Sequence, residues 1–373
     1  MNAKRTVIAA IVTILIFGLF ANFSQGAQDK NKDKDKQAVK QEEKVYIPPQ
    51  VKTIMQEGMA ARQGRQDIPF TIFKNFVFPA AQNLHAVFLF KAKNSDLGYV
   101  SAPAAPAAQA PAEGEQAQAG EAQAGEAQAP AAAPLQAKVM VFLQFLQMEN
   151  GAPTKTVREI YVPALLQADS ATYDPEAEEW YSTGYPLPAG DYLLAMALAS
   201  PDLKKVGVGY FEFSLPNAAS LQGALETTPI FFVKKMDQMQ APETRTAVHK
   251  GCFMYSVLQI VPNVESIVAP GESIEILYYI FGAKPNDQQK NDIEVAYEVR
   301  QADKAAIKWA VQTYDFALVS QPLPLKQTVL IKNDQGEKQE TRDLQAGKYT
   351  LVIRIKDKIG GSTIEKILDF EVK

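Results

Sequence analysis

The 373-residue sequence contains one cysteine and two histidines. An intramolecular disulfide needs two cysteines, so the stability of the chain has to come from packed cores. We expect the thiol of Cys252 to be buried, although a lone cysteine could also join two chains. His85 lies inside an apolar run and is expected on a strand face. His249 has only Cys252 near it in sequence, too few ligands for zinc. The sequence therefore predicts no metal and no cofactor.

Motifs of nucleophilic and nucleotide chemistry are missing as well. The chain has no Gly-x-Ser-x-Gly string and no glycine-rich loop that ends in Gly-Lys-Ser or Gly-Lys-Thr. An enzyme that works through two carboxylates stays possible, because sequence alone cannot exclude that geometry. The formal charge of −4 is spread over both signs without a basic stripe, so nucleic acid is not an expected partner. We predict a non-catalytic protein.

The N-terminus has the features of a secretory signal peptide over residues 1–26. Lys4 and Arg5 precede an apolar run at 7–20, and the small residues Ser24 and Gly26 precede a possible cleavage site. An uncleaved membrane anchor is the alternative, because the apolar segment approaches the lower length limit of a spanning helix. The mature protein is therefore expected in the periplasm or outside the cell, or else held at the membrane by this anchor.

Two further segments have the composition of disordered chain. Residues 27–45 interleave lysine with aspartate and glutamate and contain no aromatic residue, which predicts a charged tether. Residues 101–137 consist almost wholly of alanine, proline, glutamine, glutamate and glycine. Because apolar runs resume directly after it, we interpret this low-complexity stretch as an insertion in one loop of the first domain.

The remaining chain reads as strands, apart from a short helical pattern over residues 51–59 that predicts a docking helix. Apolar and β-branched runs of strand length are separated by proline and glycine, and no long helix alternates with them. The predicted class is all-β: two tandem antiparallel β-sandwich domains at 46–235 and 249–373, joined by a linker at 236–248. The strand runs are 70–78, 84–90, 139–146, 157–162, 192–198, 206–215, 230–233, 253–261, 274–281, 293–299, 349–355 and 363–372.

A short repeated motif supports an internal duplication. Leu187-Pro-Ala-Gly-Asp-Tyr192 and Leu344-Gln-Ala-Gly-Lys-Tyr349 share one spacing, and the apolar alternation that follows matches without a gap. This pattern resembles the tyrosine corner of immunoglobulin-like and fibronectin type III sandwiches. The resemblance covers six residues in each copy, and it implies that Tyr192 and Tyr349 are structural, with hydroxyls bonded to upstream backbone. The alternative is chance similarity between two β-hairpins.

One stretch, residues 169–185, combines acids with aromatic rings and is the candidate contact loop. Loops on rigid sandwiches often carry recognition, so we expect an exported binding or scaffold protein whose partner is a protein or glycan of the cell envelope. One alternative is a carbohydrate- or ligand-binding module that stacks sugars on these rings, and another is that the rings fill the core. The candidate contact residues are Asp174, Glu176, Glu178, Glu179, Trp180, Tyr181 and Tyr185.

Overall fold

The computed structural model describes residues 47–80, 83–102, 134–217, 224–333 and 336–373. The predicted signal peptide, the charged tether and most of the low-complexity insertion lie outside these residues. The described chain is mostly β-strand in several antiparallel sheets with one short α-helix, which confirms the predicted all-β class. Within this part of the chain, no helix is long and apolar enough to span a membrane.

The N-terminal half consists of two facing sheets. Sheet 1 has the strand order β1-β2-β6-β11, and sheet 2 has the order β3-β4-β7-β8 with β5 added beside β4. The strands of sheet 1 are β1 (Phe70–Ala80), β2 (Asn83–Lys93), β6 (Glu178–Leu187) and β11 (His249–Lys250). The strands of sheet 2 are β3 (Val100–Ser101), β4 (Leu135–Glu149), β5 (Ala152–Ala168), β7 (Gly190–Ala199) and β8 (Val206–Leu215).

Strand alternation explains the core between these sheets. In β2, Leu84, Ala86 and Phe88 belong to a buried cluster shared with β4, β5 and β7, whereas Val87 and Leu89 belong to a different cluster on the opposite face. Because neighbouring strand residues point to opposite sides, a run that is apolar at every position is buried on both faces. Sheet 1 is therefore an inner layer of the molecule.

The C-terminal half also has two sheets with a core between them. Sheet 3 contains β9 (Glu226–Thr227), β10 (Phe231–Gln238), β12 (Phe253–Tyr255), β13 (Leu258–Pro262), β15 (Ser273–Phe281) and β19 (Leu318–Pro324). Sheet 4 contains β14 (Ile267–Val268), β16 (Ile293–Gln301), β17 (Lys304–Lys308), β18 (Gln312–Tyr314), β22 (Gly347–Asp357) and β23 (Thr363–Val372). Three buried tyrosine hydroxyls cross this core in a chain, with 3.2 Å from Tyr278 to Tyr297 and 3.1 Å from Tyr297 to Tyr314.

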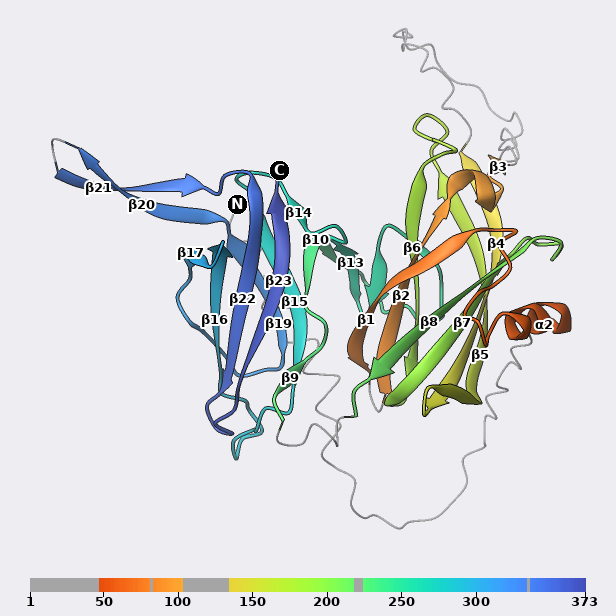
Figure 1. Ribbon diagram of the computed structural model, residues 1–373, viewed down its shortest axis with the longest axis horizontal. Helices are drawn as coiled ribbons and strands as arrows, with labels where there is room; N and C mark the ends of the chain where they lie inside the picture. The colour runs from red at the N-terminus through yellow and green to blue at the C-terminus, as the bar shows by residue number, and fades with distance from the viewer. Residues whose placement is uncertain (1–46, 81–82, 103–133, 218–223, 334–335) are drawn as a thin grey trace, which may run out of the picture.

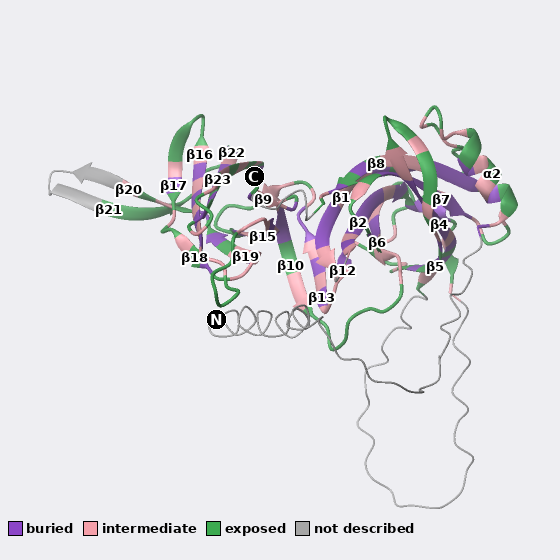
Figure 2. Ribbon diagram, turned by 90° about the horizontal axis from the view of Figure 1, so that it is seen from below, coloured by how far each residue is buried: buried purple, intermediate pink, exposed green. Residues whose placement is uncertain are grey.

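A third apolar cluster joins the two halves. Phe76 and Phe78 of β1 pack against Phe231 of β10 and Phe253 of β12, and the ring centroids of Phe76 and Phe231 are 4.2 Å apart. The next residue, Phe232, points the other way into the C-terminal core. Sheets 1 and 3 are thus both buried on two faces, and the layers follow one another across Figure 1. Buried residues, purple in Figure 2, occur at the beginning of β10 and in β1, where the halves meet.

The strand pairing corrects the predicted domain boundaries. β9 and β10, which precede the predicted linker, pair with β15 of the C-terminal half, and β11 pairs with β6 of the N-terminal half. Residues 236–238 of the predicted linker are the end of β10. The reason is the long-range pairing of residues 231–233 with residues 275–277, which a local reading of polarity does not reveal.

Helix α2 (Pro49–Glu57) covers part of the outer face of sheet 2, which confirms the predicted docking helix. Pro49 is favourable at its first turn, where the backbone N–H has no helical partner. Val51 and Met55, one helical turn apart, are buried against Phe142, Leu146 and the small residues of β7. The hydroxyl of Tyr210 donates to the carbonyl oxygen of Met55 at 2.5 Å, which ties the helix end to β8.

A separate two-stranded hairpin projects from the C-terminal half. It consists of β20 (Lys326–Asn333) and β21 (Gly336–Asp343), which pair with each other and with no other described strand. The arm extends away from the layered body in Figure 1. It was not among the strands expected from the sequence.

Candidate functional site

The candidate contact segment, residues 169–185, divides into a loop and a strand. Residues up to 177 form turns, and β6 begins at Glu178. β6 lies between β2 and β11 in sheet 1, paired with β2 along its whole length. The prediction of an exposed loop therefore needs correction for its second half, because that half is an inner strand.

The acids of this segment are engaged within the chain. Lys93 and Lys91 of β2 lie 2.7 Å from Glu176 and 3.8 Å from Glu178, and Lys250 of β11 pairs with Glu179. The hydrogen bond and charge of Glu176 raise the pKa of Lys93. These pairs follow from the register, since the lysines lie on the strands that flank β6. The acids thus fasten the loop and strand to their neighbours.

The Asp174 side chain has a local structural role instead. Its carboxylate accepts the backbone N–H of Glu176 at 2.9 Å, and its own carbonyl oxygen accepts the side-chain amide of Asn94 at 2.8 Å. This is an Asx-type turn, the conformation that aspartate favours in loops. None of the four candidate acids is therefore free of a partner in the chain.

The three candidate rings are packed to different degrees, and the clearest correction concerns Tyr181. Its side chain is fully buried, its ring lies 5.6 Å from that of Phe90, and its hydroxyl is 3.3 Å from the hydroxyl of Tyr99. Burial and the contact with Tyr99 raise its pKa well above the ordinary value. Sequence reasoning left open whether this ring contacts a partner or fills the core, and strand alternation places it in the core.

Trp180 and Tyr185 are half-buried. Trp180 packs against the cluster between the halves, and its carbonyl oxygen accepts the N–H of Gly251 at 3.1 Å. Tyr185 stacks near Phe145 with centroids 6.2 Å apart, and the guanidinium of Arg158 lies 5.6 Å from the ring centre. The rings therefore do not form one flat surface on which a sugar could stack.

The two tyrosine motifs adopt equivalent local structures. The hydroxyl of Tyr192 donates to the carbonyl oxygen of Pro188 and that of Tyr349 to the carbonyl oxygen of Gln345, both at 2.9 Å. Both rings are buried and stack on a phenylalanine of the following strand, and burial raises both pKa values. A tyrosine bonded to backbone four residues upstream has the geometry of a tyrosine corner.

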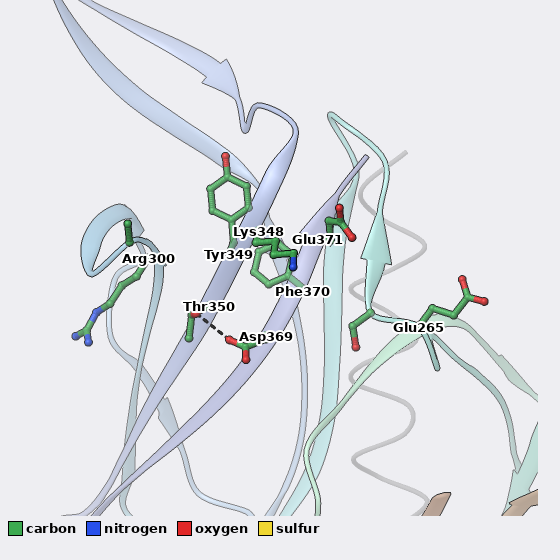
Figure 3. A pocket seen from close by; sticks show the side chains of 10 residues that line it. Glu265, Arg300, Lys348, Tyr349, Thr350, Asp369, Phe370 and Glu371 are labelled. Carbon is green, nitrogen blue, oxygen red and sulfur yellow. Dashed lines mark hydrogen bonds between the residues drawn. The ribbon is translucent and has the colours of Figure 1, made fainter. Parts of the chain in front are cut away.

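An open depression lies beside the second corner (Figure 3). Its volume is about 520 Å³, and it is lined by the backbone-bonded Tyr349 together with charged residues of both signs. The Thr350 hydroxyl donates to Asp369 at 2.8 Å across β22 and β23. The charged lining residues of the depression are the basic Arg300 and Lys348 and the acidic Glu265, Asp369 and Glu371, so it presents no strong potential of one sign.

The scarce histidines and the cysteine occupy separate places. Cys252 is buried, as predicted, and its sulfur accepts the side-chain amide of Gln259 at 3.3 Å. His249 contacts Glu243 at 2.9 Å, and burial lowers the pKa of His85 to about 4. In the part of the chain that the structure describes, no group of three or more His, Cys, Asp or Glu residues could hold a metal ion.

An exposed apolar row on sheet 2 was missed by the sequence reasoning. Val100 is 65% exposed, Leu165 is 53% exposed and Tyr161 is 37% exposed, and they make up three of the six exposed large apolar residues among those described. The row lies on the outer face, because Tyr161 stacks on Phe142, which α2 helps to cover. The signal was present: residues 160–166 are apolar at every position, which is unusual for an edge strand.

Comparison with protein-family models finds no match to the chain, and comparison with curated proteins finds none either.

Proposed function

We propose that the protein is an exported, non-catalytic binding protein of the cell envelope that contacts another protein through the outer face of sheet 2. The observation that carries this proposal is the exposure of Val100, Tyr161 and Leu165 on a face that α2 covers only in part. Exposed large apolar side chains that share one face of a sheet commonly mark interaction sites.

The layered architecture supports a role in which rigidity matters. The cluster around Phe76, Phe231 and Phe253 joins both halves, so the exposed row is carried on a continuous packed body. Pro163 lies within the exposed side of β5 and cannot donate a backbone hydrogen bond, which discourages strand addition at this edge. Contact through the side chains of the face is the better-supported mode.

A glycan partner has less support. The rings that were candidates for sugar stacking are buried or half-buried in sheet 1, whereas the exposed row is largely aliphatic. Aliphatic side chains favour a protein surface, because sugar recognition uses flat aromatic faces together with hydrogen bonds.

The test is photo-crosslinking in living cells of the producing organism, with a photoreactive residue at position 165. A matched control places the same residue at Ile367, which is 62% exposed but stands on sheet 4 near the Arg354–Glu365 ion pair. We expect position 165, and not position 367, to yield a discrete adduct with one envelope protein, and Leu165→Asp to weaken capture of that protein. Equal labelling at both positions, or recovery of the protein only in the cytoplasm, would contradict the proposal.

A further inference from the structure

We infer that the β20–β21 arm mediates self-association, with β20 of one copy pairing antiparallel with β20 of a second copy. The inference is independent of the proposed contact face on sheet 2. The arm pairs with no other described strand. A two-stranded hairpin without further strands or a covering helix is only marginally stable in water, so an added strand would stabilise it. The side chains described at its base, from Lys326 to Thr328 and from Gln339 to Asp343, are exposed or half-buried.

The register of the arm shows which backbone groups are free. Asn333 pairs with Gly336 across two intervening residues, so these two form a hydrogen-bonded pair. Hydrogen-bonded pairs alternate along an antiparallel ladder. At the base, the N–H of Leu344 donates to the carbonyl oxygen of Leu325 at 3.2 Å, which places the odd-numbered residues of β20 in such pairs. The even-numbered residues, from Lys326 to Lys332, therefore direct their N–H and C=O groups away from β21.

This edge is suited to pairing. It contains no proline, and its central residues, Thr328 to Ile331, are β-branched or apolar. Its only charged residues are Lys326 and Lys332, so the edge lacks the mixed charges of β21. β17 lies near β20, but β21 is the only described strand that pairs with β20.

The spacing of the lysines excludes one register for a second copy, and the apolar residues favour another. If Thr328 faced Leu330 of the other copy, Lys326 would face Lys332, and like charges directly opposite one another are destabilising. If Leu330 faces Leu330, then Val329 faces Ile331 and Thr328 faces Lys332, so no like charges meet and the apolar residues are central. An antiparallel pair of this kind has two-fold symmetry, which closes the assembly at a dimer. A contact of one strand pair is small, so the dimer should form in a concentration-dependent way.

The first test is sedimentation velocity of the whole exported chain over a range of concentrations, with Leu330→Pro and Gln339→Pro compared. Each proline removes one outward N–H and leaves the hydrogen bonds within the hairpin in place. Gln339 faces Leu330 across the hairpin and lies on the opposite edge. We expect the unmodified chain and Gln339→Pro to dimerise and Leu330→Pro to stay monomeric at every concentration. A monomeric unmodified chain, or a dimer that survives Leu330→Pro, would overturn the inference.

The second test fixes the register by disulfide trapping. Facing residues of a hydrogen-bonded antiparallel pair have Cα atoms about 5.5 Å apart, within the range that a disulfide spans. Leu330→Cys should therefore give a covalent dimer on mild oxidation, whereas Thr328→Cys should not, because the two Thr328 residues lie four positions apart in this register. Cys252 is buried and does not compete. Equal trapping of both variants would refute the Leu330-centred register.

Discussion

Tyr192 and Tyr349 show how far a single hydroxyl fixes local structure. Each ring packs in a core, and each hydroxyl reaches back to a carbonyl oxygen of the preceding turn. The bond connects the strand to the turn that precedes it, so the hydroxyl holds the entry of the strand in place.

Replacing Tyr349 with phenylalanine should keep the ring packing and leave the carbonyl oxygen of Gln345 without its donor. We expect a loss of about 1 kcal/mol in the free energy of unfolding, because a part-buried hydrogen bond is removed. Tyr192→Phe should act alike. Urea titration provides the measurement, and Tyr161→Phe, at a 37% exposed position, is the matched control. If Tyr349→Phe proves as mild as the control, then the hydroxyl is held by water.

The burial of His85 predicts that the free energy of unfolding decreases at acidic pH. Burial lowers its pKa from 6.5 to about 4 in the folded protein, so the folded state stays neutral while the unfolded state takes up a proton. The stability that this neutral histidine contributes is therefore complete above pH 6.5 and is lost as the pH falls toward 4. The loss should amount to roughly 2–3 kcal/mol. Urea titrations of the unmodified protein and of His85→Gln should diverge across this window, and parallel curves would show that His85 is hydrated.

At the scale of elements, local patterns were predictable and long-range pairing was not. The hairpin from Tyr192 to Leu215 was recognisable because its turn and its alternation are contiguous in sequence. The position of Tyr181 could not be decided because its burial depends on β2, about ninety residues earlier in the chain. The arm at 326–343 was missed because its polar residues look like loop, and Phe231 gave no local sign that it packs on β1.

Residues 64–68 lie so close to β8 that a side chain at Gly207 should be destabilising. Residues 64–68 run along β8, with a bridge between Gln66 and Gly207 and a 2.8 Å bond from the N–H of Val208 to the carbonyl oxygen of Arg65. A Cβ atom on Gly207 would lie 1.9 Å from the carbonyl oxygen of Ile68. Gly207→Ala should therefore cost about 3 kcal/mol, since the backbone segment has to move.

Gly209→Ala is the control for this substitution, because its Cβ would lie 3.0 Å from the edge of the Phe70 ring, which can shift. We expect a cost within about 1 kcal/mol for this variant. Thermal melts of both proteins provide the comparison. A Gly207 variant as stable as the Gly209 variant would mean that residues 64–68 do not hold this position on β8.

At the scale of the whole molecule, the shared cluster decides how the protein unfolds. Three separate apolar layers lie between the four sheets, and the middle layer belongs to both halves. Unfolding either half alone would expose the face of Phe76 and Phe78 or the face of Phe231 and Phe253 to water. Because exposing such an aromatic face is costly, the two halves should unfold together.

Adjacent phenylalanines on β10 allow this coupling to be tested. Phe231 packs in the layer between the halves, and Phe232 packs in the C-terminal core beside Phe370. Truncating either ring to alanine should cost about 3–5 kcal/mol.

Calorimetry of the unmodified protein and of Phe232→Ala should show one transition each. The transition of the variant should lie at a lower temperature, because the layer between the halves is intact. Phe231→Ala should instead separate into two transitions, since the coupling is weakened while each core remains. Hydrogen exchange assigns them to the strands of sheets 1 and 2 and to the strands of sheets 3 and 4. A single transition in Phe231→Ala would show that the halves are held together by the chain connections rather than by this layer.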